Sequence, residues 1–273
     1  MNRGSAGGVA EAPTASRPEY GNWVSTRFVV VPALTAVVLA VLAVATHVLL
    51  HISWLAGVLL GAAVLAGLVS AYFAYARRLL AAGAGEVQAR VQSLVLERLA
   101  WDGRGRALDI GCGNGPLSIA LAGKFPRALV TGIDFWGESW EYSRDVCESN
   151  AAGRGVAERV SFQQASAAAL PFADESYAAV VSNLCFHEVH GVRDKREVVR
   201  EALRVLEPGG AFAFQDLFRL KSAYGEIDEL VAAVRGWGVA SVEYVDTGKS
   251  EFVPGALRLP FMVGSMGILH GRK

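Results

Sequence analysis

The stretch that decides the fold of this 273-residue chain reads Leu108-Asp109-Ile110-Gly111-Cys112-Gly113-Asn114-Gly115-Pro116. It follows a short apolar run and opens a pattern of helical spacing. Glycines at positions 111, 113 and 115 let the backbone turn tightly and let a ligand approach where a Cβ atom would clash. Pro116 suits the first position of a helix, whose free N–H groups then face the ligand. The stretch therefore predicts a ligand-binding loop between a strand and a helix.

A carboxylate before the glycines indicates what kind of ligand this loop binds. The spacing is G-x-G-x-G, which differs from the G-x-G-x-x-G pattern of dinucleotide-binding loops. Asp109 would repel a pyrophosphate and suits an ammonium group instead. Asp134 stands 19 residues after Gly115, at the end of the second predicted strand, where a carboxylate accepts both hydroxyls of a ribose. A cationic amino acid joined to a nucleoside is S-adenosylmethionine, which we predict as the cofactor.

Short apolar runs alternate with helical patterns around this loop. The alternation predicts a parallel sheet with helices on both faces. Two last strands follow without an intervening helix and are expected to form an antiparallel hairpin at the sheet edge. The predicted fold is a Rossmann-like, doubly wound, seven-stranded α/β sheet. The predicted strands are 107–110, 128–133, 160–163, 178–182, 211–215, 241–245 and 261–270, and the predicted helices are 86–101, 116–124, 138–150, 194–206 and 225–235.

Two later segments complete a resemblance to a known family. Leu170-Pro171-Phe172 resembles the L-P-F segment of the class I S-adenosylmethionine-dependent methyltransferases, and residues 204–210, RVLEPGG, resemble their R-V-L-x-P-G-G signature. With the glycine loop and Asp134, these motifs occur in the family's order. The resemblance covers about residues 86–273 and is closest to the branch of quinone-biosynthesis and small-molecule methyltransferases.

This resemblance implies roles for individual residues. The glycine loop with Asp109 would hold the methionine end of the cofactor, Asp134 the ribose, and Phe135 or Trp136 one face of the adenine. Ser166 replaces the Asp with which the family usually contacts the adenine amine, so that contact is expected to be weaker or rearranged. Ala178 replaces a second usual Asp, at the fourth strand. The predicted cofactor-binding residues are Asp109, Gly111, Cys112, Gly113, Asn114, Gly115, Asp134, Phe135, Trp136, Ser166, Ala167 and Asn183.

The segment after the fourth predicted strand supplies the candidate catalytic residues. It runs from Asn183 to His190, and the family places residues beside the transferred methyl group there. His187 and Glu188 are the candidates for a general base, because a titratable side chain can take a proton from the acceptor. The alternative for His187 is a hydrogen-bonded structural residue at a helix start. No metal is predicted, because His187-Glu188-x-His190 is one residue short of the H-E-x-x-H spacing.

Charge is distributed unevenly along the chain. Only 19% of residues are charged, and no Asp, Glu, Lys or Arg occurs from Phe28 through Ala76. A membrane helix needs ~20 apolar residues, so this stretch predicts two transmembrane helices, about 28–50 and 54–76. The alternative is a buried apolar hairpin of a soluble protein. Residues 1–27, rich in Gly, Ala, Ser and Pro, predict a disordered tail, and residues 77–273 the methyltransferase domain.

The flanks of the apolar stretch predict its orientation. Arg17 and Arg27 precede it and Arg77 and Arg78 follow it, whereas the turn between the spans has no Lys or Arg. By the positive-inside rule, the N-terminus and the catalytic domain are cytoplasmic. The Gly57-x-x-x-Gly61 spacing permits close helix packing, within the hairpin or between two copies as a homodimer.

The charge and cysteine content of the chain exclude some classes of function. Zero net charge without a basic cluster argues against a nucleic-acid partner, and three cysteines without a C-x-x-C argue against a disulfide framework or zinc ribbon. We predict a membrane-anchored enzyme that methylates a small lipophilic acceptor, such as a lipid, isoprenoid or quinone, drawn from membrane lipid. The alternatives are a water-soluble acceptor and a non-catalytic cofactor-binding module. Segments 217–224 and 248–260 are the candidates to cover the substrate.

Overall fold

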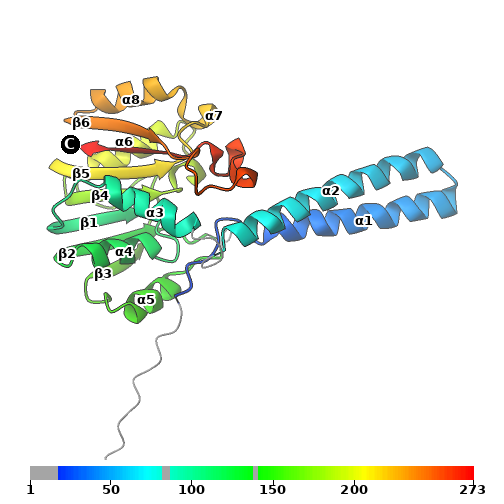
Figure 1. The fold of residues 1–273 in the computed structure, drawn as a ribbon, viewed down its shortest axis with the longest axis horizontal. Coiled ribbons are helices and arrows are strands. Elements are labelled where there is room, and N and C mark those ends of the chain that lie inside the picture. The colour runs from blue at the N-terminus through cyan, green and yellow to red at the C-terminus, as the bar shows by residue number, and fades with distance from the viewer. Residues whose placement is uncertain (1–17, 82–86, 138–140) are drawn as a thin grey trace, which may run out of the picture.

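The structure, a computed structural model, describes residues 18–81, 87–137 and 141–273. The tail up to residue 17 and the predicted helix starts at Glu86 and 138–140 lie outside the described residues. Figure 1 shows a layered α/β domain with a two-helix hairpin projecting from it. The elements are α1 (Arg27–Leu50), α2 (Ser53–Leu79), α3 (Val87–Arg98), β1 (Gly105–Ile110), α4 (Pro116–Lys124), β2 (Ala128–Asp134), α5 (Arg144–Gly153), β3 (Val160–Gln164), β4 (Tyr177–Asn183), η1 (Phe186–Glu188), α6 (Arg196–Arg204), β5 (Leu206–Asp216), α7 (Lys221–Tyr224), α8 (Ile227–Gly236), β6 (Ser241–Asp246), η2 (Gly255–Leu257), η3 (Pro260–Gly264) and β7 (Gly267–Arg272).

The seven strands form one sheet in the order β3-β2-β1-β4-β5-β7-β6. The pairs among β1 to β5 are parallel, and β7 is antiparallel to both β5 and β6. This confirms the predicted Rossmann-like sheet and its antiparallel C-terminal hairpin, with β6 as the edge strand and β7 inside. The strand order reverses between β1 and β4, and ligands of such sheets bind outside the carboxyl ends of the strands at the reversal.

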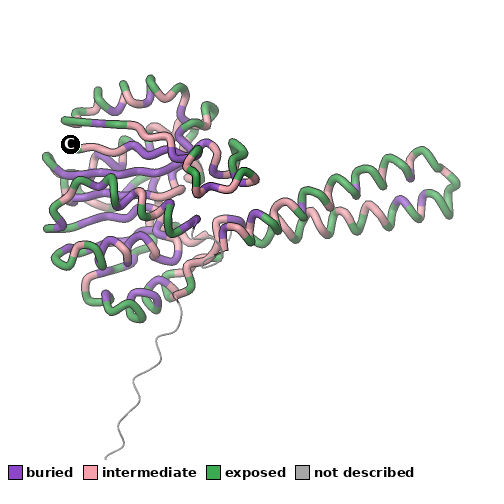
Figure 2. Tube along the Cα trace, viewed as in Figure 1, coloured by how far each residue is buried: buried purple, intermediate pink, exposed green. Residues whose placement is uncertain are grey.

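Helices cover both faces of this sheet. One apolar core lies under α3, α4 and α5 and includes Val95, Leu117 and Cys147. The other lies under α6, α7 and α8 and includes Val198 and Leu230. Figure 2 shows the strands buried and the outer turns of the helices exposed. The two cores fix the strands, and thereby the loops at their carboxyl ends.

Two predicted boundaries were wrong for local reasons. Residues 261–270 were predicted as one strand, but the strand begins only at Gly267. Pro260 instead opens the short helical turn η3, because its fixed φ suits the first helical position. The helix predicted from residue 138 begins at Arg144, where the Ser143 side chain caps it by accepting from the Val146 N–H at 3.3 Å.

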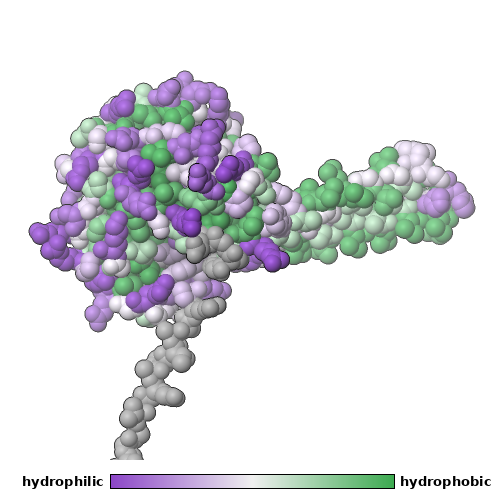
Figure 3. Space-filling model, viewed as in Figure 1, coloured by the Kyte–Doolittle hydropathy of each residue, from purple (hydrophilic) through white to green (hydrophobic). Residues whose placement is uncertain are grey.

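The hairpin consists of two helices that contact mainly each other. Both are long and apolar enough to cross a membrane by length and composition. Most of their large apolar side chains are exposed, and Figure 3 shows the visible face of the hairpin as far more hydrophobic than that of the domain. Isolated helices with such surfaces do not suit water, since exposed apolar patches of this extent mark binding or membrane surfaces.

Small residues spaced seven apart join the two helices. Ala56, Ala63 and Ser70 of α2 are buried, and the Ser70 hydroxyl donates to the Val29 carbonyl at 2.8 Å. A Cβ atom added at Gly57 or Gly61 would meet no atom within 4 Å. Gly57 and Gly61 therefore do not contribute to packing within the hairpin, which was one of the two roles predicted for them. The homodimer stays a prediction.

The segment 18–26 differs from the predicted disordered tail. The Asn114 and Asn150 side-chain amides both donate to the Glu19 carbonyl at 3.0 Å, and the Tyr142 hydroxyl donates to the Asn22 carbonyl at 2.9 Å. Arg77, near the end of α2, hydrogen-bonds the Val24 carbonyl. We call residues 18–26 the strap, because they tie the glycine loop to the base of the hairpin.

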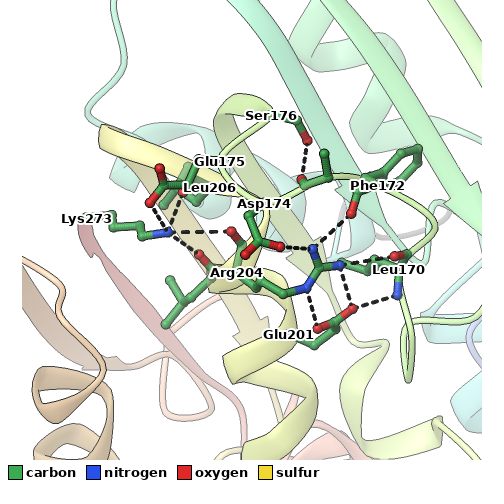
Figure 4. Close-up of polar contacts among 11 residues, drawn as sticks. Leu170, Phe172, Asp174, Glu175, Ser176, Glu201, Arg204, Leu206 and Lys273 are labelled. Carbon is green, nitrogen blue, oxygen red and sulfur yellow. Dashed lines mark hydrogen bonds and ion pairs between the residues drawn. The ribbon is translucent and has the colours of Figure 1, made fainter.

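Arg204 explains why two of the sequence motifs occur together. Its guanidinium donates to the carbonyls of Leu170 and Phe172 at 3.1 and 2.9 Å, and it forms ion pairs with Glu201 and Asp174 at 2.8 and 2.6 Å. Figure 4 shows this network around the guanidinium. The R-V-L motif thus holds the L-P-F segment in place by hydrogen bonds to its backbone.

Replacing Arg204 with Ala is expected to destabilise the domain by about 2–4 kcal/mol, because the partly buried Glu201 carboxylate and two carbonyls lose their donor. For a domain of this size, that corresponds to a decrease in Tm of roughly 5–15 °C, measured on the full chain in detergent. Arg200→Ala is the matched control, since its ion pair with Glu197 on the same helix is exposed. Equal Tm values for the two variants would contradict the structural role of Arg204.

Candidate functional site

The glycine loop is shaped by backbone conformations that only glycine adopts easily. Gly111, Gly113 and Gly115 have φ values of 76°, 56° and 82°. A Cβ atom at Gly111 would collide with the Cys185 side chain, and one at Gly115 would lie 3.0 Å from the Phe162 ring. The loop therefore passes directly over the start of the segment that follows β4. Gly115 then caps α4.

Side chains from three other elements hold the centre of this loop. The Gly113 N–H donates to Asp134 Oδ2 at 2.9 Å. The Gly113 carbonyl accepts from Trp136 Nε1 and from Cys147 Sγ, both at 3.0 Å. Asp134 Oδ1 also accepts from the Trp136 N–H at 2.9 Å. The predicted ribose carboxylate is thus fixed by the backbone, with its remaining lone pairs at the edge of the cavity described next.

A cavity of about 670 Å³ lies at the carboxyl ends of the strands, where the strand order reverses. It brings together ten of the twelve residues predicted to bind the cofactor, together with His187 and Glu188. Gly115 and Trp136 do not line it. Trp136 instead supports the Gly113 carbonyl, so Phe135, which is 63% exposed and does line the cavity, is the better candidate for the adenine face.

Two residues that line this cavity, Asp109 and Asn183, each have a buried side-chain oxygen, Oδ1, without a hydrogen-bond donor among the described residues. The other oxygen of Asp109 accepts from the Ser118 hydroxyl at 2.6 Å. Burial raises the pKa of Asp109 to about 7, with Ser118 opposing the shift and Asp134 adding to it. A buried acceptor without a partner is costly, so both oxygens fit a ligand that brings a cationic donor. The ammonium of S-adenosylmethionine is such a donor.

His187 lies on η1 in the same cavity and is held by a carboxylate that the sequence analysis missed. Its Nδ1 is 2.6 Å from Oδ1 of Asp216, the fully buried last residue of β5, and its Nε2 is 3.4 Å from Glu188 Oε1. Asp216 Oδ2 also accepts from the Phe186 N–H at 2.7 Å. Burial alone would lower the pKa of His187, but Asp216 and Glu188 outweigh it and raise the pKa to about 10.

Asp216 gave only a faint signal in the sequence. It directly follows the predicted strand 211–215, beside Gln215, and no motif marks it. Its distance of 29 residues from His187 hides the pair, which forms because β4 and β5 are neighbours. Among the described residues, no three His, Cys, Asp or Glu side chains gather as metal ligands.

The two departures from the family pattern fall in different places. Ser166 lines the cavity, and its hydroxyl accepts from the Ala168 N–H at 3.2 Å. Ala178 lies at the amino end of β4, close to where a Cβ atom on Gly105 would be, and does not line the cavity. The loss of an Asp at position 178 therefore leaves the floor of the site unchanged.

The far wall of the cavity comes from segments not expected there. Residues 217–224 and 248–260, the predicted covers, do not line it. The strap lines it instead, with Tyr20, Trp23 and Val24, as does η3 with Phe261, Met262 and Val263. Phe28 of α1 and Phe73 of α2 complete the wall. The cavity thus reaches from the glycine loop to the base of the hairpin.

The sheet, the glycine loop and the carboxylate at the end of β2 define a Rossmann-type domain that suits a nucleoside cofactor. Residues 107–210 match a family model described as a methyltransferase domain. This match confirms that the chain carries a methyltransferase domain, as the motifs predicted, and it agrees with the class I S-adenosylmethionine-dependent family that they resemble.

Two curated relatives illustrate this similarity. A 27-O-demethylrifamycin SV methyltransferase from Amycolatopsis mediterranei is 36% identical over 142 residues, which cover 52% of this chain and 49% of that protein. A ubiquinone/menaquinone biosynthesis C-methyltransferase from Geotalea daltonii is 32% identical over 117 residues, which cover 42% of this chain and 46% of that protein. The chain thus spans about half the length of the curated relatives that it matches.

Solved structures support the fold. A geranyl diphosphate C-methyltransferase from Streptomyces coelicolor superposes with a TM-score of 0.53 at 14% identity, covering 68% of this chain and 79% of that one. The cyclase SpnF superposes with a TM-score of 0.51 at 22% identity, and the match covers 67% of this chain and 80% of that one. Since one fold neighbour carries the name of a methyltransferase and another that of a cyclase, the reaction has to be argued from the site.

Proposed function

We propose that the protein transfers a methyl group from S-adenosylmethionine to a small lipophilic acceptor at the cytoplasmic face of a membrane. The observation that carries this proposal is one continuous cavity with three parts. Asp109, Asn183 and Asp134 offer acceptors for a cationic nucleoside at one end, His187 lies beyond them, and apolar side chains of the hairpin form the far wall.

The residues of this site divide the chemistry between them. The bound cofactor supplies an electrophilic methyl group. Asp109 and the glycine loop orient the methionine end, Asp134 orients the ribose, and the cavity places the acceptor in line, which is how positioning accelerates transfer. Once deprotonated, His187 takes a proton from the acceptor, and Asp216 fixes the orientation of its ring. Glu188, 3.4 Å from Nε2, is the second candidate to receive that proton.

The hairpin supports the membrane location. Its apolar side chains face outward along two helices that the domain hardly covers, whereas the core helix of a soluble protein would be buried. The turn between α1 and α2 has no Lys or Arg, and arginines flank the other ends, so both termini face the cytoplasm.

The experiment is to incubate the full chain in native membranes with S-adenosylmethionine that carries a labelled methyl group. We expect label in the organic-extractable fraction, and we expect the protein to stay with the membrane on carbonate extraction. Label only in water-soluble products would contradict the lipophilic acceptor. Cofactor binding with no labelled product would instead favour a non-catalytic module.

A further inference from the structure

We propose that the acceptor is an amphiphile whose apolar chain enters the cavity directly from the bilayer, between Phe28 and Phe73 of the hairpin and Phe261 and Met262 of η3. We call this gap the portal. This inference rests on the proposed function and names the substrate class and its route. The acceptor's polar head would reach His187, and its chain would lie in the portal.

The aromatic residues of the portal connect the hairpin to the domain. The rings of Phe28 and Phe73 stack at 5.4 Å, and the Tyr72 and Phe261 rings meet edge to face at 6.5 Å. The Tyr72 hydroxyl also donates to the Ala256 carbonyl at 3.0 Å. These contacts fix the portal to the turns of α1 and α2 nearest the domain, where aromatic side chains of a membrane protein are typical of the interface.

Exposure shows where the cavity opens. Phe261 is 59% exposed and Phe28 39% exposed, although both line the cavity, so they lie at an opening. Phe135 is also an exposed lining residue, but it follows β2. In the proposed arrangement, the polar cofactor enters from water beside Phe135, and the apolar chain enters by the portal.

The inner surface suits a chain followed by a reactive head. Leu184 packs in the same apolar cluster as Phe73 and Met262, and Val189, His187 and Glu188 also line the cavity. An apolar chain needs no hydrogen-bond partners along the first part of this path, whereas a hydroxyl at its end meets the imidazole. A free phosphate or a sugar would leave the aromatic wall without a partner.

The test uses the full chain in vesicles of phosphatidylcholine and phosphatidylglycerol, with two photoreactive probes. One is a long-chain alkylphenol with a diazirine on its chain, and the other is phosphatidylcholine with a diazirine on an acyl chain. We expect the alkylphenol to label Leu184 or Val189, mapped by peptide mass spectrometry, and phosphatidylcholine to label only the outside of the hairpin. Alkylphenol adducts confined to the hairpin's outside would overturn the portal.

A matched pair of variants sharpens this test. Phe261→Asp places a charge in the portal and is expected to reduce labelling at Leu184 and Val189 at least tenfold, because a carboxylate beside an apolar chain is poorly solvated. Leu259→Asp places the same charge two residues away on a side chain that is 39% exposed and does not line the cavity, so labelling should persist. Equal labelling in both variants would overturn the portal.

Labelling requires neither cofactor nor turnover, so the two proposals fail separately. Interior labelling by the alkylphenol in a protein that methylates no lipid supports the portal and contradicts the proposed function. Methylation of a lipid-soluble acceptor without interior labelling overturns the portal and leaves the proposed function standing.

Discussion

Replacing Asp216 with Asn is expected to lower the limiting rate of methyl transfer at high pH by about 10²-fold and to shift the pH profile. Asp216 is the main group that raises the pKa of His187 to about 10, against the effect of burial. A base must be deprotonated to act, so the rate of the unmodified protein should rise about tenfold per pH unit between about pH 7 and 9. Without the carboxylate, burial dominates and the rising limb moves to lower pH. The measurement is initial rate against pH with labelled cofactor.

Two further variants distinguish the effect of Asp216 on the pH profile from the effects of Glu188 and Tyr224. Glu188→Gln removes a carboxylate that is farther from the ring and 46% exposed, so its effect on the pH profile should be smaller. Tyr224, whose own pKa is raised by burial and then by Asp216, also faces this carboxylate, and Tyr224→Phe should leave the rising limb in place. A larger effect from Glu188→Gln than from Asp216→Asn would make Glu188 the base. A profile unchanged in Asp216→Asn would contradict the positioning role of Asp216.

Local patterns predicted most of the fold. The glycine loop with Pro116 located the start of α4, because turn and cap residues act within a few positions. The strand cores were predicted because fully buried parallel strands are continuous apolar runs. The strand predicted from Phe261 failed because an apolar run after a proline fits a helical turn equally well, and tertiary contacts decide between them.

The site was predicted where it follows a motif and missed where it depends on distant segments. Asp109 and Asp134 lie at the carboxyl ends of β1 and β2, and His187 follows β4. The order of these strands along the chain is typical of the family, so the convergence of the three residues was expected. Asp216 was missed because only the pairing of β4 with β5 brings it to His187. The strap was predicted as disordered from its composition, yet its backbone is held by Asn114 and Asn150. Composition cannot reveal hydrogen bonds supplied by side chains about a hundred residues away.

Replacing Asp134 with Ala is expected to weaken S-adenosylmethionine binding by about 10²-fold, measured by calorimetry on the full chain in detergent. Without the carboxylate, the ribose hydroxyls lose their hydrogen bonds to a charged group, and each such bond is worth about 1.5–3 kcal/mol. The substitution also frees the Gly113 and Trp136 N–H groups that Asp134 now holds at 2.9 Å, so the glycine loop loses its support. Asp102→Ala is the control, because Asp102 is exposed and does not line the cavity.

The same measurement with 5′-methylthioadenosine, which lacks the amino acid, tests the orientation of the cofactor. Asp134→Ala should weaken the binding of both ligands, because both contain the ribose. Asp109→Asn retains an oxygen for the Ser118 hydroxyl but loses the charge that faces an ammonium, so it should weaken S-adenosylmethionine alone. If Asp109→Asn weakened both ligands equally, the methionine end would not lie at Asp109. Two carboxylates on neighbouring strands would then share one end of the ligand, and the cavity toward the hairpin would have to hold the methionine rather than the acceptor.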